Sequence, residues 1–315
     1  MKKIGLFGLF LLLMLTSLVV GVKDISLMQL FQLDAKQHLV LVTTRVPRTI
    51  SLVIAGSTIS ISGLIMQHLT QNKFVSPSTA GTTDSARLGM IVVMLFFPSA
   101  PLLFRSFVAF LFAFVGTLLF IFLTRFLPAK NQLMIPLIGV MFGNIIGASA
   151  TFFAYQFQLV QNMSSWLQGN FATVMKGNYE LLYLAVPLLV ITYLFAYQFT
   201  VVGMGEEMAT NLGIHYRQIQ LIGLGIVALA SAVVLIMVGS IPFLGVIVPN
   251  LVSMRYGDHM KHTLAITAVS GSLFLLACDI VARAVIAPYE VPVSVIVGVL
   301  GSFIFIILLM RGKLS

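Results

Sequence analysis

Charge, acidic groups and cysteine are all scarce in this chain of 315 residues. Charged residues make up 9% of it, whereas 59% of the residues are hydrophobic and the mean hydropathy is +1.06. A water-soluble domain does not need so many apolar residues, so this balance excludes that class of protein. The one cysteine, Cys278, stands in an apolar segment, which excludes an intramolecular disulfide and any metal site built from several cysteines. We therefore expect an inert, buried thiol in a membrane protein.

The sequence also lacks the usual catalytic motifs. It has no Gly-x-x-x-x-Gly-Lys-Ser/Thr loop, so we do not expect it to bind and hydrolyse ATP, and it has no His-Glu-x-x-His pair. His259 and His262 have a spacing that could hold a metal ion. They share a short hydrophilic turn with Asp258 and Lys261, however, which is typical of a solvated loop. These absences predict a chain that is not an enzyme and has no catalytic residue, cofactor or metal ion.

Acidic residues number nine, and we expect all but Asp279 at helix ends or in loops. A secondary transporter couples transport to ions through carboxylates around broken helices, and Asp279 alone does not make such a site. A polytopic membrane enzyme would need a nucleophile, a base or metal ligands that converge within the spans, and we find none. Transport driven by a partner protein is therefore the leading hypothesis, with these two classes as its rivals.

The net charge of +9 comes from basic residues scattered singly between apolar runs. Nucleic-acid binding needs clusters of Lys and Arg, so we expect membrane lipid around the chain and no nucleic-acid partner. One span needs about 20 apolar residues, so the chain has room for roughly ten spans in a single membrane domain, residues 1–315. They are expected near 4–22, 49–70, 86–98, 101–125, 133–157, 181–200, 217–239, 243–254, 262–286 and 291–311.

The predicted topology places both chain ends on the cytoplasmic side. An even number of spans brings the termini together, and the basic residues show a modest excess on the side of the N-terminus, as the positive-inside rule requires. The run from Ile4 to Val22 has no good small-x-small cleavage site, so we expect an uncleaved helix rather than a signal peptide. The polar segment 23–44 is expected to be a surface loop. The segments 86–98 and 243–254 are too short to cross alone.

Several predicted helices carry small residues at four-residue spacing. The clearest set is Gly139, Gly143 and Gly147. Such a stripe permits close approach between helices, and packing within the subunit is favoured over a direct role in transport. Asn144 in the same segment needs a partner or a water-filled cavity, so a packing hydrogen bond and lining of a path are equally consistent with it. The same two alternatives apply to Gln67 and His68.

Motifs from about residue 45 onward occur in the order found in one known family. They are Arg45-Val46-Pro47-Arg48-Thr49, Ser62 to Gln67, Asn72 to Pro77 with Gly81, Met204 to Ala209 with Leu212-Gly213, Gly239 to His262 around Pro242 to Asn250, and Asp279 to Arg283. Each motif is weak alone, but the ordered set is specific. The chain resembles the permeases of iron-siderophore and cobalamin importers, which are type II ABC importers. Two positions depart from the commoner sequence of the family's motifs: Lys73 replaces a proline after Asn72, and Asn250 replaces a histidine after Pro249.

The resemblance implies an all-α permease of about ten transmembrane helices in the cytoplasmic membrane. It pairs with a second permease subunit, identical or homologous, and the translocation path lies at their interface. It also implies two cytoplasmic ATPase subunits and an extracytoplasmic, lipid-anchored siderophore-binding protein. The implied cargo is a ferric siderophore, and the segment Phe74 to Gly81 resembles the subgroup for catecholate or mixed-type siderophores in Gram-positive bacteria. Cobalamin or haem is the alternative cargo within the family.

The resemblance also implies roles for particular residues. The cytoplasmic gate would involve Asn72, Phe74, Gln132 and Leu133. The weakly polar span that carries Asn144 fits the wall of the path. A coupling segment, about residues 203–216, would contact the ATPase through Gly205, Glu206, Glu207, Ala209, Leu212 and Gly213. Acidic residues of the binding protein would dock at Arg45, Arg48 and Arg283.

The residues themselves fit two of these roles. Gly203 to Gly213 is a hydrophilic island between two long apolar spans, and its glycines allow a sharp turn out of the membrane, so short helices here can dock in a groove of the ATPase. Pro47 suits the first turn of a helix, which would place Arg45 and Arg48 at a helix N-terminus, where the macrodipole disfavours cations. Two unfavourable cations suggest an acidic partner, whereas Arg283 can also snorkel to the interface.

Overall fold

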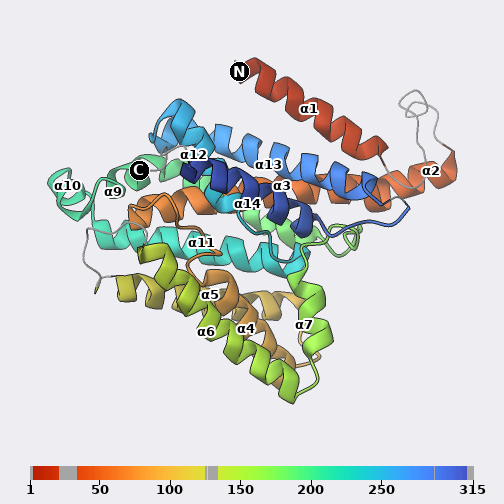
Figure 1. Ribbon diagram of the computed structural model, residues 1–315, viewed down its shortest axis with the longest axis horizontal. Coiled ribbons are helices and arrows are strands. Elements are labelled where there is room, and N and C mark those ends of the chain that lie inside the picture. Colours follow the sequence, from red (N-terminus) through yellow and green to blue (C-terminus); the bar gives the residue numbers. More distant parts are fainter. Residues whose placement is uncertain (1–2, 21–33, 125, 127–133, 287, 311–315) are drawn as a thin grey trace.

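The computed structural model describes residues 3–20, 34–124, 126, 134–286 and 288–310. These residues form an all-helical bundle (Figure 1), and among them the only β-type pairing is an isolated bridge between Gln168 and Ser240. The elements are α1 (Lys3–Val19), α2 (Ala35–Val40), the π-helical turn η2 (Leu41–Arg45), α3 (Val46–Thr70), α4 (Thr82–Phe96), α5 (Leu102–Thr124), α6 (Met134–Gln156), α7 (Val160–Leu167), the 3-10 helix η3 (Glu180–Leu184), α8 (Ala185–Leu194), α9 (Ala196–Val202), α10 (Glu206–Asn211), α11 (Tyr216–Val238), α12 (Leu244–Tyr256), α13 (Met260–Ala284) and α14 (Val293–Met310).

Each of the ten predicted spans corresponds to a helix or a helix pair, which confirms the all-α membrane fold. Five helices in the described ranges are long and apolar enough to cross a membrane, or six when the pair Glu180–Leu194 and Ala196–Val202, bent by 65°, counts as one span. Helices α4 and α12 have 15 and 13 residues, as expected for the two short segments. In Figure 1, α14 ends on the left-hand side, nearer to α10, whereas α1 begins near the middle of the top of the picture.

The segment before α3 differs from the prediction. Residues 21–33 lie outside the described part of the chain, but one continuous helix runs from Gln37 to Thr70 where a surface loop was expected to extend to residue 44. Pro47 has no N–H to donate. The hydrogen-bond ladder widens just before it, where the N–H of Val46 donates to Leu41 O, so the helix passes through the proline as a π turn. The prediction that Arg45 and Arg48 stand at a helix N-terminus is therefore wrong.

Helix α3 lies at the centre of the bundle and contacts α11, α12 and α13. Glycines let the backbones meet: a Cβ added to Gly63 would lie 1.9 Å from Gly245 O in α12, and one added to Gly56 would lie 2.7 Å from Gly271 O in α13. Most residues of α3 are buried as a result. The helix therefore holds the polar residues at its two ends in fixed positions against its neighbours.

Helices α4, α5 and α6 form a second layer, in the lower part of Figure 1. The glycine stripe of α6 faces α4 and the segment before it. A Cβ added to Gly139 would lie 2.1 Å from Thr79 O, and one added to Gly143 would lie 2.7 Å from Asp84 Oδ2. Packing within the subunit, predicted for this stripe, is confirmed. Asn144 lies on the other, exposed side of α6.

Candidate functional site

An arginine cluster lies where the start of α3 meets the end of α13. Arg48 Nε and Nη2 donate to Asp279 Oδ1 at 3.1 and 2.8 Å, and Arg48 Nη1 donates to Glu290 Oε2 at 2.7 Å. Asp279 also forms an ion pair with Arg283, four residues further along α13. Asp279 is 0% exposed, so its charge lies inside the bundle. The guanidinium groups of Arg48 and Arg283 balance that buried charge.

Two of the arginines also hold the end of α1. Arg45 Nη1 donates to Leu18 O and to Val19 O at 2.7 Å each, and Arg283 Nη1 donates to Val20 O at 2.7 Å. The last carbonyl groups of a helix have no partner within it, and cations are favoured near a helix C-terminus. The arginine cluster therefore caps α1 and joins it to α3 and α13.

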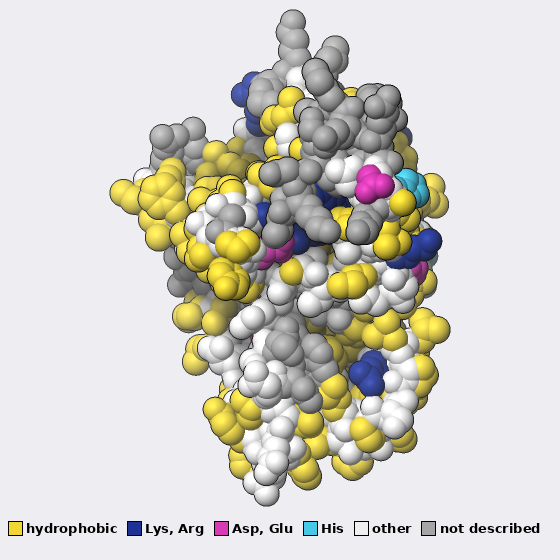
Figure 2. All heavy atoms as spheres, turned by 90° about the vertical axis from the view of Figure 1, so that its right-hand side faces the viewer, with side chains coloured by type: hydrophobic (Ala, Val, Ile, Leu, Met, Phe, Trp, Pro, Cys, Tyr) yellow, Lys and Arg dark blue, Asp and Glu magenta, His cyan; other side chains and the backbone are white. Residues whose placement is uncertain are grey.

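The three arginines predicted to dock a binding protein border one cavity of about 240 Å³, together with Glu290. Arg45, Arg48 and Arg283 are only 7%, 9% and 7% exposed. The structure thus brings these residues together from distant parts of the sequence, but it gives each of them partners within the chain. Figure 2 views this end of the molecule and shows basic and acidic side chains close together near the middle of the face.

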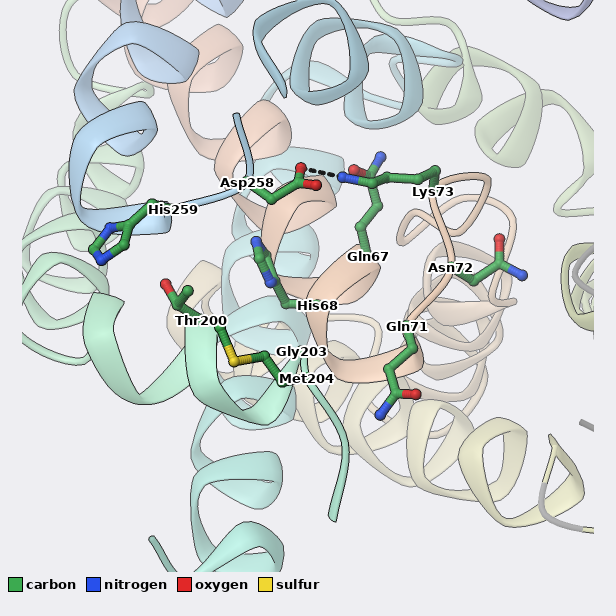
Figure 3. Close-up of a pocket in the computed structure, with 10 residues that line it drawn as sticks. All are labelled: Gln67, His68, Gln71, Asn72, Lys73, Thr200, Gly203, Met204, Asp258 and His259. Carbon is green, nitrogen blue, oxygen red and sulfur yellow. Dashed lines mark hydrogen bonds and ion pairs between the residues drawn. The ribbon is translucent and has the colours of Figure 1, made fainter. Parts of the chain in front are cut away.

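A polar pocket of about 340 Å³ lies at the other end of α3 (Figure 3). His68 is buried there, and its ring lies against Gly203, where an added Cβ would be 2.4 Å from Nδ1. The pocket therefore brings the end of α3 next to the start of the coupling segment. Its lining residues are Gln67, His68, Gln71, Asn72, Lys73, Thr200, Gly203, Met204, Asp258 and His259.

Lys73 and Asp258 form an ion pair at this pocket (Figure 3). Lys73 Nζ also donates to Ser253 Oγ at 2.9 Å, and Lys73 O accepts a hydrogen bond from Asn250 Nδ2 at 2.7 Å. Partial burial of Asp258 opposes its ionisation, but the hydrogen bonds from Lys73 and Ser253 and the charge of Lys73 outweigh burial. Together they hold the pKa of Asp258 below its usual value.

The predicted gate residues next to this pocket are buried. Asn72 is 2% exposed, and its Oδ1 accepts a hydrogen bond from the N–H of Phe74 at 2.9 Å, which closes a tight turn. The Phe74 ring meets Phe305 of α14 edge-on, with 6.1 Å between ring centroids. Gln132 and Leu133, the other two predicted gate residues, lie outside the described part of the chain.

The coupling segment contains the sharp turn that its glycines predicted. Gly205 and Gly213 have φ values of 111° and 74°, which glycine adopts at little cost. Between them, Glu206 and Glu207 are exposed on the first turn of α10, and Ala209 faces inward. Three apolar side chains of the segment face solvent in the isolated chain. They are Met204, Met208 and Leu212, with exposed fractions of 60%, 49% and 53%.

Sequence reasoning missed Glu290 as a partner of Arg48, and it missed the pairing of Lys73 with Asp258. The departure from proline at position 73 was the one signal that a charged side chain stood beside the predicted gate residues. His259 and His262 are exposed, as predicted, but only His259 lies in the turn, because His262 belongs to the first turn of α13. In the described ranges, no group of three His, Cys, Asp or Glu side chains is placed to hold a metal ion.

The apolar helices, with polar sites at the two ends of a buried central helix, define a multi-pass membrane protein. Residues 9–311 match the FecCD transport family. With nearly the whole chain covered by this match, the protein belongs to that family.

Individual relatives agree with this assignment. The chain is 48% identical to the petrobactin import system permease protein YclN of Bacillus subtilis, over 99% of both chains. It is 41% identical to the ferric-anguibactin transport system permease protein FatD of Vibrio anguillarum, over 96% of both chains. A solved structure of an inward-facing, metal-chelate type ABC transporter matches with a TM-score of 0.82 and 25% identity over 98% of both chains.

Proposed function

We propose that this chain is the membrane-spanning permease subunit of an ABC importer that carries a ferric siderophore across the cytoplasmic membrane. The observation that carries the proposal is the 48% identity to a petrobactin permease over 99% of both chains. A second petrobactin permease, from Bacillus anthracis, is 40% identical over 86% of this chain. The first candidate cargo is therefore ferric petrobactin or a chelate of similar shape.

Cobalamin is the second candidate. The vitamin B12 import system permease protein BtuC of Vibrio cholerae is 30% identical over 98% of this chain, which is a weaker match than the siderophore permeases. A secondary transporter is disfavoured because Asp279, the carboxylate expected within a span, is engaged by Arg48 and Arg283.

In the proposed assembly, two permease subunits enclose the path, two ATPase subunits bind the cytoplasmic face, and a lipid-anchored binding protein delivers the chelate. ATP hydrolysis belongs to the ATPase subunits because this chain has no phosphate-binding loop. Both termini and α10 are assigned to the cytoplasmic side. The end of α14 lies on the same side of Figure 1 as α10, which supports that assignment for the C-terminal helix.

The coupling segment is proposed to dock in a groove of the ATPase. Its exposed apolar residues, Met208 and Leu212, support this role, because solvent-facing apolar side chains gathered on a short projecting helix are typical of a contact surface. The gate is proposed at Asn72 and Phe74, where the polar pocket connects it to the coupling segment. Asn144 is proposed to line the path, since it lies on the exposed side of α6.

The arginine cluster is proposed to receive acidic residues of the binding protein. Arg45, Arg48 and Arg283 already have partners in the chain, so docking must proceed by exchange of partners. Glu290 is the partner best placed to leave, because its side chain is 25% exposed whereas that of Asp279 is 0% exposed.

Reconstitution of the chain in liposomes with its ATPase and binding protein tests the proposed function. We expect ATP-dependent uptake of radiolabelled ferric petrobactin and much weaker uptake of cobalamin. Uptake by the chain alone, driven by a proton gradient, would contradict the proposal in favour of a secondary transporter. Import of cobalamin without import of any ferric siderophore would contradict the proposal that the cargo is a ferric siderophore.

A further inference from the structure

Lys73 is tied to α12 by both its side chain and its main chain. The side chain reaches Asp258 and Ser253, and the carbonyl group accepts a hydrogen bond from Asn250. Asn250 is 1% exposed, and its amide nitrogen also donates to Val246 O at 2.8 Å, which fixes its position. Lys73 and Asn250 are the two motif positions at which this chain departs from the commoner sequence of the family that it resembles. The structure places these two departures in direct contact.

Lys73 also stands between the two proposed gate residues. We name residues 71–75 the gate turn. Gln71 has a positive φ of 50°, and the Asn72 side chain accepts a hydrogen bond from the N–H of Phe74. Lys73 is directly bonded to Phe74, whose N–H is held by the Asn72 side chain and whose ring contacts Phe305 of α14. We therefore expect a shift of Lys73 relative to α12 to be passed on to Phe74.

Asp258 connects the same ion pair to the coupling segment. It lies in the turn between α12 and α13, and at the end of that turn the N–H of Met260 donates to Thr200 Oγ1 of α9 at 3.0 Å. Helix α9 runs directly into Gly203, which meets the ring of His68. A contiguous path of contacts thus leads from the coupling segment through α9 and Asp258 to the gate turn.

The exposure of the pair distinguishes it from a purely structural ion pair. The Lys73 and Asp258 side chains are 36% and 58% exposed. Water can replace their contact at small cost, so an ion pair of this kind contributes little to the stability of the fold. The same property allows the pair to break and re-form during a transport cycle.

We propose that Lys73 is a positioning residue for the cytoplasmic gate, and that its ion pair with Asp258 links the gate turn to movement of the coupling segment. The inference rests on the proposed function, which places the gate at Asn72 and Phe74. While the pair is formed, the gate turn is held against α12 and Phe74 stays on α14. When the ATPase moves the coupling segment, Asp258 moves away with the turn after α12, and the gate turn keeps only hydrogen bonds, including the one from Asn250, to hold it against α12.

The test uses the assembled importer in liposomes, with ATP hydrolysis and uptake of ferric petrobactin measured on the same samples. Lys73→Gln and Asp258→Asn should each lower the uptake per ATP hydrolysed by about two- to fivefold, the range expected for loss of one exposed ion pair. Hydrolysis should continue in both. Lys73→Glu combined with Asp258→Lys should restore the ratio, because the pair re-forms with exchanged charges. The matched control is Lys261→Gln, which removes an exposed basic charge from the start of α13 and should leave the ratio unchanged.

Different outcomes separate this inference from the proposed function. Absence of ATP-driven uptake by the parent protein would overturn the proposed function itself. A normal parent with unchanged ratios in both single variants would overturn only the role of Lys73, and so would an exchanged pair that performs no better than the single variants.

A cross-link covers the case in which a single variant does not assemble. Cysteines placed at Lys73 and Asp258 in a Cys278→Ala background should stop uptake when a cleavable thiol cross-linker joins them. Cleavage of the cross-linker should restore uptake. Normal uptake with the cross-link intact would overturn the inference.

Discussion

Replacing Asp279 with asparagine removes the charge that balances two buried arginines while it keeps nearly the same side-chain volume. Asp279 accepts hydrogen bonds from Nε and Nη2 of Arg48 and forms an ion pair with Arg283, and it is 0% exposed. After the replacement, Arg48 keeps its ion pair with Glu290. Within the described residues, the other acceptors of Arg283 are uncharged oxygens of Ser17 and Val20.

The expected cost follows from this imbalance. Breaking a buried ion pair by removal of one partner costs about 3–5 kcal/mol, because a charge remains buried without compensation. We expect Asp279→Asn to lower the free energy of unfolding by that amount. Glu290→Gln is the matched control: it removes one partner of the same Arg48, but its side chain is 25% exposed, so the expected loss is about 0–1 kcal/mol.

Reversible unfolding in mixed detergent micelles measures both losses. A double variant, Arg283→Gln with Asp279→Asn, should recover part of the loss, since the guanidinium group that Asp279→Asn leaves uncompensated is gone. The expected coupling energy is about 1–3 kcal/mol. A loss below about 1 kcal/mol for Asp279→Asn, or a loss equal to that of Glu290→Gln, would refute the reasoning.

Three further predictions concern the coupling segment, the path and the central packing. Leu212→Asp puts a charge on the exposed apolar surface of the coupling segment, so ATP hydrolysis should continue in liposomes while uptake falls severalfold; normal coupled uptake would contradict docking there. Asn144→Cys, in a Cys278→Ala background, should react with a water-soluble thiol reagent in at least one nucleotide state, whereas protection in every state would place Asn144 in packing. Gly63→Ala would set a methyl group 1.9 Å from Gly245 O, so the free energy of unfolding should fall by about 1–3 kcal/mol; an unchanged value would show that α3 and α12 can separate freely.

The positions of the helices could be predicted because a bilayer demands about 20 apolar residues for each span. The continuation of α3 back to Gln37 could not, since polar residues followed by Pro47 are typical of a loop that precedes a helix. A π turn needs only a local shift of the hydrogen-bond ladder, and nothing in the local composition predicts it.

The partners of the site residues were harder to predict from the sequence than the site residues themselves. Arg48 and Asp279 were both singled out, yet the contact between them joins positions 231 residues apart. Because long-range pairing depends on how the helices pack, spacing along the sequence does not reveal it. Burial of Arg48 also changes how docking should be tested: a reversal to glutamate would place a carboxylate beside Asp279, so loss of the fold would obscure any loss of docking.

The two ends of α3 carry ion pairs of different kinds, and this difference indicates which end can move. At the arginine cluster, Asp279 is fully buried, so its separation from the guanidinium groups would leave charges uncompensated in a medium of low dielectric constant. At the polar pocket, Lys73 and Asp258 are 36% and 58% exposed, so water replaces their contact when it breaks. A transporter must rearrange without losing its fold. We therefore expect docking at the arginine cluster to exchange Glu290 and leave Asp279 in place, and we expect the rearrangement that opens the proposed gate to take place at the polar pocket.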